Sequence, residues 1–181
     1  MAESVFARRK SNSVYWRNKS NDLLGAAGLI WAGILNNEVL ERKTLGLPDW
    51  YSFEIACPPV FRMLCGMSVE LLIKAIIVQR GDEPKQTHNL NRLAEQATLC
   101  VAREHAQLLS VLTESVVWHG RYPVPKTRPA FDRARELERD ALTRRVPLGS
   151  FSVLHPNHAL NWENFLGIWN KFDEIYRASD A

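Results

Sequence analysis

The segment from Val60 to Val78 constrains the fold more than any other part of the chain. Fourteen of its 19 residues are apolar, and in a helix they would surround the axis on every side. A helix that is apolar all round lies at the centre of a bundle. Pro58 and Pro59 suit the first helical turn, which lacks partners for its backbone N–H groups, and Gly81 suits a C-terminal cap. We therefore predict a central helix over residues 58–80.

Helical periodicity recurs along most of the remaining chain. Apolar residues spaced by three and four predict further helices over residues 13–35, 102–118, 131–144 and 161–178. A short helix that carries Leu90, Leu93 and Ala94 is expected to start near Thr87 or Asn89. No segment shows convincing alternation with period two, so no strand is expected. The sequence predicts an all-α fold, an up-and-down bundle of four to six helices that forms a single domain over residues 1–181.

The segments between these helices are rich in proline, glycine or charge. We expect a flexible basic N-terminus over residues 1–12 and a loop over 44–57 whose aromatic side chains pack back on the core. Two prolines at i,i+2 restrict the residues before them to extended conformations, which predicts a turn over 121–130. Residues 146–160 are expected to form a loop, either a lid or a linker.

Composition excludes several classes of protein. With 46% hydrophobic and 24% charged residues, the chain is neither disordered nor a disulfide scaffold. Three cysteines without CxxC spacing favour reduced thiols in a cytoplasm. The longest uncharged apolar run, Leu23–Leu35, has 13 residues, whereas a membrane span needs about 20, so we interpret it as a buried helix. We expect a cytoplasmic protein with no cofactor, no metal and no membrane partner.

The net charge of +3 is unevenly distributed. Residues 1–20 and 121–145 each carry +4, and the remainder therefore carries −5. If the two basic segments share one face, they could bind phosphates. The alternative is a solvated helix with i,i+4 charge pairs. The candidate nucleic-acid contacts are Arg121, Lys126, Arg128, Arg135 and Arg139.

Glu70 and Lys74 interrupt the central apolar helix. They are four residues apart, with the glutamate N-terminal, which is the favourable order for a helical ion pair. A buried ion pair is costly unless further hydrogen bonds satisfy it. One interpretation is a structural clasp that orients a neighbouring polar group, either His88 or Arg121. The other interpretation is a functional cleft.

The order of these motifs resembles the HEPN family of helical domains. The family pattern is a helix with "ELLLKA" followed by "H-(N/D)-L-x-x-L", which is similar to Glu70–Ala75 and then His88-Asn89-Leu90 with Leu93. The helix from residue 13 and the segment Trp118–Pro123 are more weakly similar, so the resemblance covers about residues 13–125. It implies a helical bundle of four or five helices, commonly a homodimer, that binds RNA or a nucleotide or cleaves RNA.

Cleaving members of that family carry an arginine followed, after four to six residues, by a histidine. None of the five histidines here has an arginine at that spacing. The remaining catalytic candidates are His119 and Arg121, since a histidine beside a phosphate-binding arginine suits acid–base chemistry on RNA. Alternatively, Arg121 donates to carbonyls at the end of its helix.

Three functions therefore stay open. The first is a non-catalytic or divergent module that binds RNA or a nucleotide. The second is a metal-independent endoribonuclease of toxin–antitoxin or phage-defence type. The third is a helical module that binds a partner protein.

Overall fold

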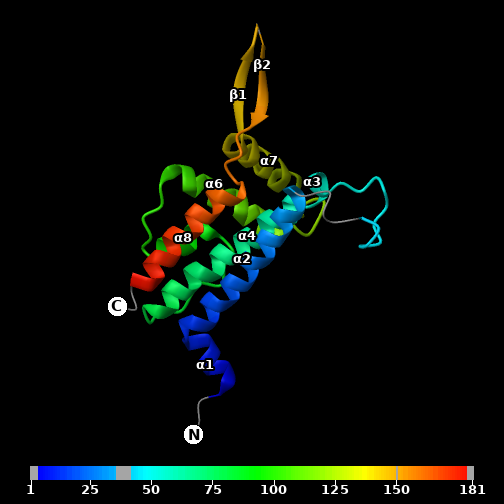
Figure 1. Ribbon diagram of the computed structural model, residues 1–181. Coiled ribbons are helices and arrows are strands. Elements are labelled where there is room, and N and C mark those ends of the chain that lie inside the picture. Colours follow the sequence, from blue (N-terminus) through cyan, green and yellow to red (C-terminus); the bar gives the residue numbers. More distant parts are fainter. Residues whose placement is uncertain (1–3, 36–41, 150, 179–181) are drawn as a thin grey trace.

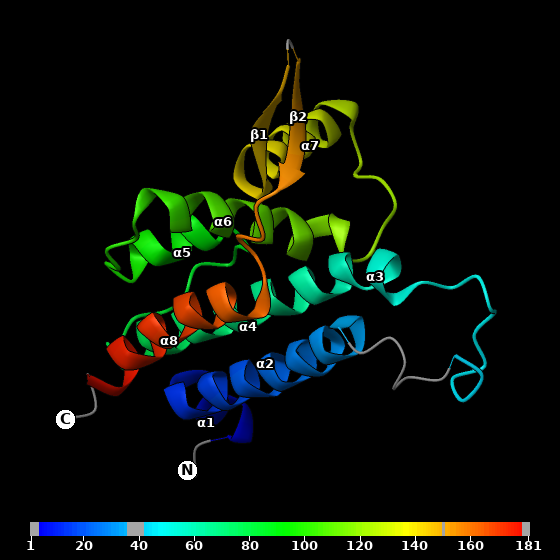
Figure 2. The same ribbon diagram turned by 45° about the horizontal axis from the view of Figure 1, so that its top comes forward.

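The computed structural model describes residues 4–35, 42–149 and 151–178. Helix α4 (Pro58–Gln79) runs through the middle of the bundle, as predicted. It packs against four helices: α2 (Ser13–Leu35), α8 (Trp162–Ala178), α5 (Leu90–Gln96) and α6 (Arg103–Glu114). Figure 2 shows α2 on one side of α4 and α5 and α6 on the other. Neighbours on several sides bury most of α4, because apolar residues surround its axis. The predicted mostly helical bundle is confirmed.

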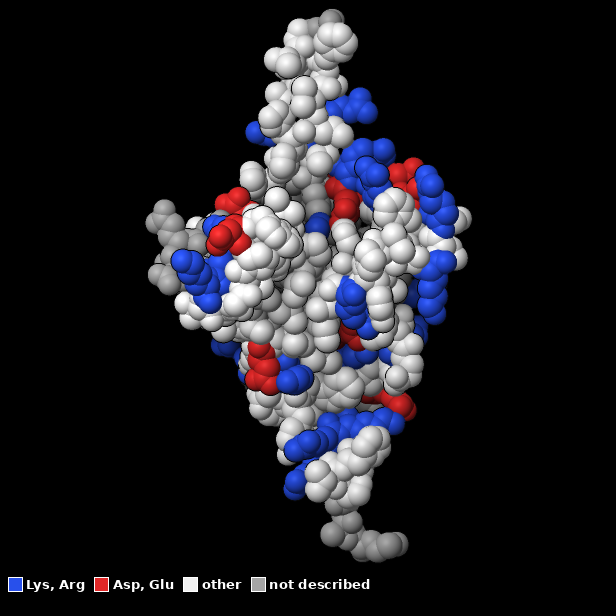
Figure 3. Space-filling view, turned by 90° about the vertical axis from the view of Figure 1, so that its right-hand side faces the viewer, with Lys and Arg blue, Asp and Glu red and all other residues white. Residues whose placement is uncertain are grey.

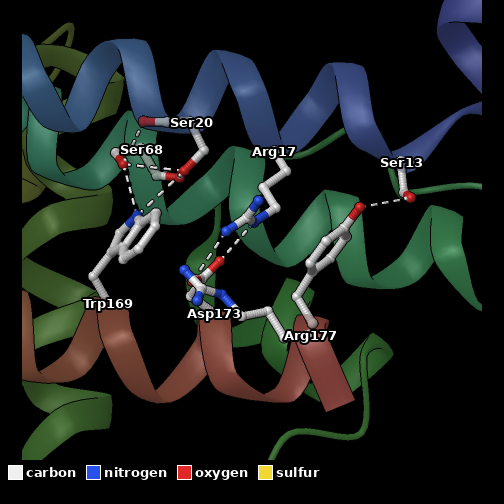
Figure 4. A network of polar contacts seen from close by, with 8 residues as sticks. Ser13, Arg17, Ser20, Ser68, Trp169, Asp173 and Arg177 are labelled. Atoms are coloured by element: carbon white, nitrogen blue, oxygen red, sulfur yellow. Dashed lines mark hydrogen bonds and ion pairs between the residues drawn. The ribbon is translucent and has the colours of Figure 1, made fainter. Parts of the chain in front are cut away.

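Polar side chains tie α2, α4 and α8 together within the core (Figure 4). The hydroxyl of Ser20 donates to the carbonyl of Ser68 at 2.7 Å, and the hydroxyl of Ser68 donates to the carbonyl of Ser20 at 2.9 Å. The indole Nε1 of Trp169 donates to the Ser68 hydroxyl at 2.9 Å. Every one of these buried polar groups has a partner, which is the condition for burying them without a large loss of stability.

Helix α6 continues into a π-helical turn, η1 (Ser115–His119), where the sequence predicted one α-helix to Trp118. The turn packs closely on α4. A Cβ atom on Gly66 would lie 2.6 Å from Cγ2 of Val116 and 2.9 Å from the carbonyl oxygen of Leu112. Glycine at this position therefore allows α4 and the end of α6 to approach each other.

Helix α7 (Arg128–Leu142) begins earlier than the predicted 131 and ends before the predicted 144. Thr127 caps it, with the hydroxyl accepting from the backbone N–H of Ala130, and Pro129 lies in the first turn, where no donor is needed. The proline-rich turn therefore ends at residue 127 instead of 130.

A β-hairpin follows α7 and projects beyond the helices (Figure 1). Strands β1 (Thr143–Leu148) and β2 (Phe151–Pro156) are antiparallel, with Arg145 opposite Leu154. The predictions of no strand and of a loop over 146–160 were wrong. Most side chains of both strands are exposed, so neither face required the alternation of apolar and polar residues that marks a half-buried strand.

The N-terminal half differs from the predictions in three places. Residues predicted to be flexible form a short helix, α1 (Val5–Ser11). Residues 44–57 include a one-turn helix, α3 (Phe53–Ala56), and Phe53 is buried there, but Trp50 is 83% exposed and does not pack on the core. In α2, Leu29 and Leu35 are exposed, so the apolar run is covered on one side only.

Among the described residues, no helix combines the length and apolar character needed to cross a membrane.

Candidate nucleic-acid interface

A cleft of about 1210 Å³ lies between α7, the base of the hairpin and the beginning of α4. The C-terminal end of α2 and residues 157–161 complete its walls. Its apolar lining includes Trp31, Phe61, Leu142, Leu154 and Leu160. The cleft therefore combines an apolar floor with the charged face of α7.

Three of the predicted phosphate-binding arginines line this cleft. Arg128, Arg135 and Arg139 are separated by seven and four residues, so they occupy one face of α7. Lys and Arg side chains gather below the hairpin, with acidic side chains among them (Figure 3). Arg128 pairs with Asp132 at 2.9 Å and Arg139 pairs with Asp140 at 3.0 Å. Both pairs are exposed to solvent and are therefore weak, so a phosphate could compete for these arginines.

Acidic residues line the cleft as well as arginines. They are Glu54, Asp132, Glu136 and Glu138. Asp132 and Glu138 are engaged by Arg128 and Arg62. Glu54 and Glu136 have no ion pair among the described residues. The cleft is therefore mixed in charge, and its basic character is concentrated along the arginine row of α7.

Glu138 joins three elements at one wall of the cleft. Nη1 of Arg62, from α4, donates to Oε1 of Glu138 at 3.0 Å, and Nδ1 of His119, from η1, lies 3.0 Å from the same oxygen. Burial raises the pKa of the Glu138 carboxyl, but the hydrogen bond from His119 and the charge of Arg62 outweigh it and lower the pKa below its ordinary value of 4.5. Glu138 is therefore held as a carboxylate.

Two residues of the cleft carry buried donors without partners. Nε1 of Trp31 and Nε of Arg62 are buried and have no hydrogen-bond partner among the described residues. Both atoms are N–H donors. A buried donor without an acceptor costs about 1–3 kcal/mol. These two N–H donors could therefore each form one more hydrogen bond.

The structure brings Glu70, Lys74 and His88 together, but away from this cleft. Nζ of Lys74 lies 2.7 Å from Oε1 of Glu70, and Nδ1 of His88 lies 3.0 Å from Oε2. Glu70 and Lys74 are nearly buried, whereas the His88 side chain is 60% exposed. Lys74 also lines a separate hollow of about 750 Å³ between α1 and the C-terminal part of α4, with Arg9 and Trp16.

Arg121 joins neither group. Its Nη2 donates to the carbonyl of Val117 at 2.6 Å, and its guanidinium lies over the ring of Tyr122. This is the alternative contact that the sequence left open. Lys126 is exposed in the segment before α7 and is not among the residues that line the cleft. His119 stacks on Trp118 and contacts Glu138, so the structure does not pair it with Arg121.

The two basic segments of the sequence lie apart. Helix α1 is at one end of the molecule and α7 at the other (Figure 1). They therefore form no common phosphate-binding face within the described part of one chain.

Sequence reasoning missed Arg62, Glu138, Trp31 and the wall formed by the hairpin. For Arg62 the sequence did contain a signal, because it is a charged residue near the start of an otherwise apolar helix. In the described parts of the chain, no cluster of three or more His, Cys, Asp or Glu side chains could hold a metal ion.

The fold and the cleft define a helical bundle with a row of arginines among carboxylates on a late helix. The family model of the HEPN domain matches residues 62–143, so the chain contains a HEPN domain. The match spans most of α4 together with α5, α6, η1 and α7, a segment that lies further along the chain than the resemblance over 13–125. Helices α2 and α8 and nearly all of the hairpin lie outside it. No curated protein and no solved structure matches the chain.

Proposed function

We propose that this chain binds RNA through the cleft beside α7 and does so without cleaving it. HEPN domains are typically RNA-targeting modules, and the observation that carries the proposal is the row of Arg128, Arg135 and Arg139 along one cleft. Phosphate contacts from arginine supply most of the affinity of such interfaces.

The length of the arginine row favours RNA over a single nucleotide. Eleven residues separate Arg128 from Arg139, which at a rise of 1.5 Å per residue is about 16 Å along the helix. A row of that length can contact several successive phosphates. One mononucleotide would leave part of it unused.

The geometry around His119 supports binding without cleavage. Proton transfer requires a catalytic group within hydrogen-bonding reach of the reacting atoms. His119 contacts Glu138 and Trp118, whereas Arg121 is hydrogen-bonded to the carbonyl of Val117 in its own helix. The two candidates for catalysis therefore do not form a joint site in this structure.

Binding is tested by fluorescence anisotropy with a labelled 12-nucleotide RNA at several salt concentrations. The variant Arg128→Ala/Arg135→Ala/Arg139→Ala is expected to bind far more weakly, and its affinity should depend less on salt, because each lost phosphate contact lowers the salt slope by about 0.7. The matched control is Arg121→Ala/Lys126→Ala, which removes basic residues outside the cleft. Equal loss in both variants, or none in the first, would contradict the proposal.

The same RNA, incubated with wild type and with His119→Ala and separated on a denaturing gel, tests the endoribonuclease alternative. Intact RNA in both samples is the expected result. Cleavage by wild type that is lost in His119→Ala, with an unchanged melting temperature, would establish the alternative instead.

A further inference from the structure

We propose that the β1–β2 hairpin, whose base forms the second wall of this cleft, takes part in RNA binding and that Arg145 binds the phosphate backbone of a single-stranded RNA that continues from α7. This inference rests on the proposed function. It concerns a part of the chain that lies almost wholly outside the matched HEPN segment.

The strand register shows which side of the hairpin faces the cleft. Residues directly opposite each other in an antiparallel pair share a face, and neighbours along a strand alternate. Thr143 pairs with Pro156 and Arg145 pairs with Leu154, so these four residues share one face. Three of the four, Thr143, Leu154 and Pro156, line the cleft. The register therefore places Arg145 on the cleft face, directly opposite Leu154.

The adjacent arginine lies on the other face. Arg144 pairs with His155, and that face continues with the pairs Val146–Val153 and Leu148–Phe151. It is apolar toward the tip of the hairpin and turned away from the cleft. Arg144 and Arg145 are both exposed, so they differ chiefly in the direction they face.

The charge of the hairpin fits a polyanion. Residues 143–156 contain two arginines and no aspartate or glutamate. Strand β1 begins directly after α7, so Arg145 continues the row of Arg128, Arg135 and Arg139. Unlike Arg128 and Arg139, it has no ion pair among the described residues, and binding a phosphate would break no existing ion pair there.

The floor of the cleft indicates a single strand. Trp31 and Leu142 are partly exposed and Leu154 is exposed, so they offer aromatic and apolar surface in the cleft, whereas Phe61 and Leu160 are buried. Unstacked bases can pack on such a surface while the backbone follows the arginines. In a duplex the bases are stacked inside and only the edges and backbone are presented, so a duplex would leave the floor uncovered.

The neighbouring arginines allow a matched test. Affinities of wild type, Arg145→Ala and Arg144→Ala are measured by anisotropy for a 12-nucleotide unstructured RNA and for a blunt 12-base-pair duplex. Arg145→Ala is expected to weaken single-strand binding about fourfold at about 0.15 M salt and to lower the salt slope by about 0.7, as for one phosphate contact. Arg144→Ala should bind like wild type, and wild type should prefer the single strand.

Three results would overturn the inference. Equal effects of the two substitutions would show that the cleft face of the hairpin does not contact the RNA, and a small effect of Arg145→Glu would do the same. Equal binding of duplex and single strand would contradict the role of the apolar floor. The proposed function fails separately, when the triple α7 variant keeps the affinity of wild type. Melting temperatures should match across these exposed substitutions.

Discussion

Nδ1 of His119 lies 3.0 Å from Oε1 of Glu138, the same oxygen that accepts a hydrogen bond from Arg62. One carboxylate therefore joins the π-helical turn, the charged helix α7 and the start of the central helix. Since α7 carries the arginine row, the position of that row relative to the cleft depends on Glu138.

Glu138→Gln should lower the free energy of unfolding by about 1–2 kcal/mol at pH 7, as expected for the loss of hydrogen bonds to a charged group. Because the pKa of Glu138 is below 4.5 in the folded protein, its contribution is present above about pH 4.5 and is lost as the pH falls through the lower folded value. The difference between wild type and variant, measured by chemical denaturation, should therefore shrink as the pH falls below 4.5. Glu163→Gln, at an exposed position of α8, is the control, and an equal pH dependence there would refute this role.

Glu136→Gln is expected to strengthen RNA binding. Glu136 lines the cleft and has no ion pair among the described residues. Its charge is therefore expected to repel a phosphate, and its removal breaks no ion pair of the fold. Removing one charge at this exposed site should raise the affinity about two- to fivefold at low salt and less at high salt, because salt screens the repulsion. The control is Glu104→Gln on α6, outside the cleft lining. Unchanged affinity in Glu136→Gln would place the RNA elsewhere.

Ser68→Ala should lower the free energy of unfolding by about 1–3 kcal/mol. It removes the donor to the carbonyl of Ser20 and the closer of two acceptors for Nε1 of Trp169. Thermal and urea denaturation measure the loss. Ser11→Ala, which removes an exposed hydroxyl on α1 that donates to the carbonyl of Ala7, should change stability by less than about 0.5 kcal/mol. Similar values for the two variants would show that the buried network contributes little.

Two glycines in helices should respond to alanine in opposite directions. Gly66→Ala places a Cβ against Val116 and the backbone of Leu112, and overpacking of this kind costs about 1–3 kcal/mol. A Cβ on Gly25 would meet nothing within 4 Å, so Gly25→Ala should stabilise the protein by about 0.5–1 kcal/mol. Melting temperatures that fall for Gly66→Ala and rise for Gly25→Ala are the expected result. A neutral Gly66→Ala would show that α4 and α6 separate easily.

The sequence predicted the central helix because a helix that packs against neighbours on several sides has apolar residues on all of its faces. Apolar residues surround α4, and the structure covers it on several sides. The run Leu23–Leu35 has a similar composition, yet Leu29 and Leu35 are exposed. Composition measures how apolar a helix is, but it does not say how many neighbours the helix will have. The same signal therefore predicted one helix correctly and overestimated the burial of the other.

The candidate site was predictable only in part. The pairing of Glu70 with Lys74 followed from charges that interrupt an apolar helix, whereas His88 was one of two candidates for their partner. The sequence identified the arginines as a set, but it did not show which of them share one wall of the cleft. Arg121, for example, has its contacts within its own helix and turn. The hairpin left little signal, because strands exposed on both faces need no alternation.

The π-helical turn constrains the number of residues between α6 and His119. Within η1 the N–H of Gly120 bonds to the carbonyl of Ser115, five residues earlier, at 3.0 Å. A π-turn amounts to one extra residue in an α-helix. Deleting a residue here would restore α-helical bonding and rotate the downstream end of the turn by about 100°, which would turn the histidine away from Glu138. Chains related to this one that are one residue shorter at this turn should therefore lack the His–Glu contact, and an alignment gap there would mark the boundary of the group that shares it.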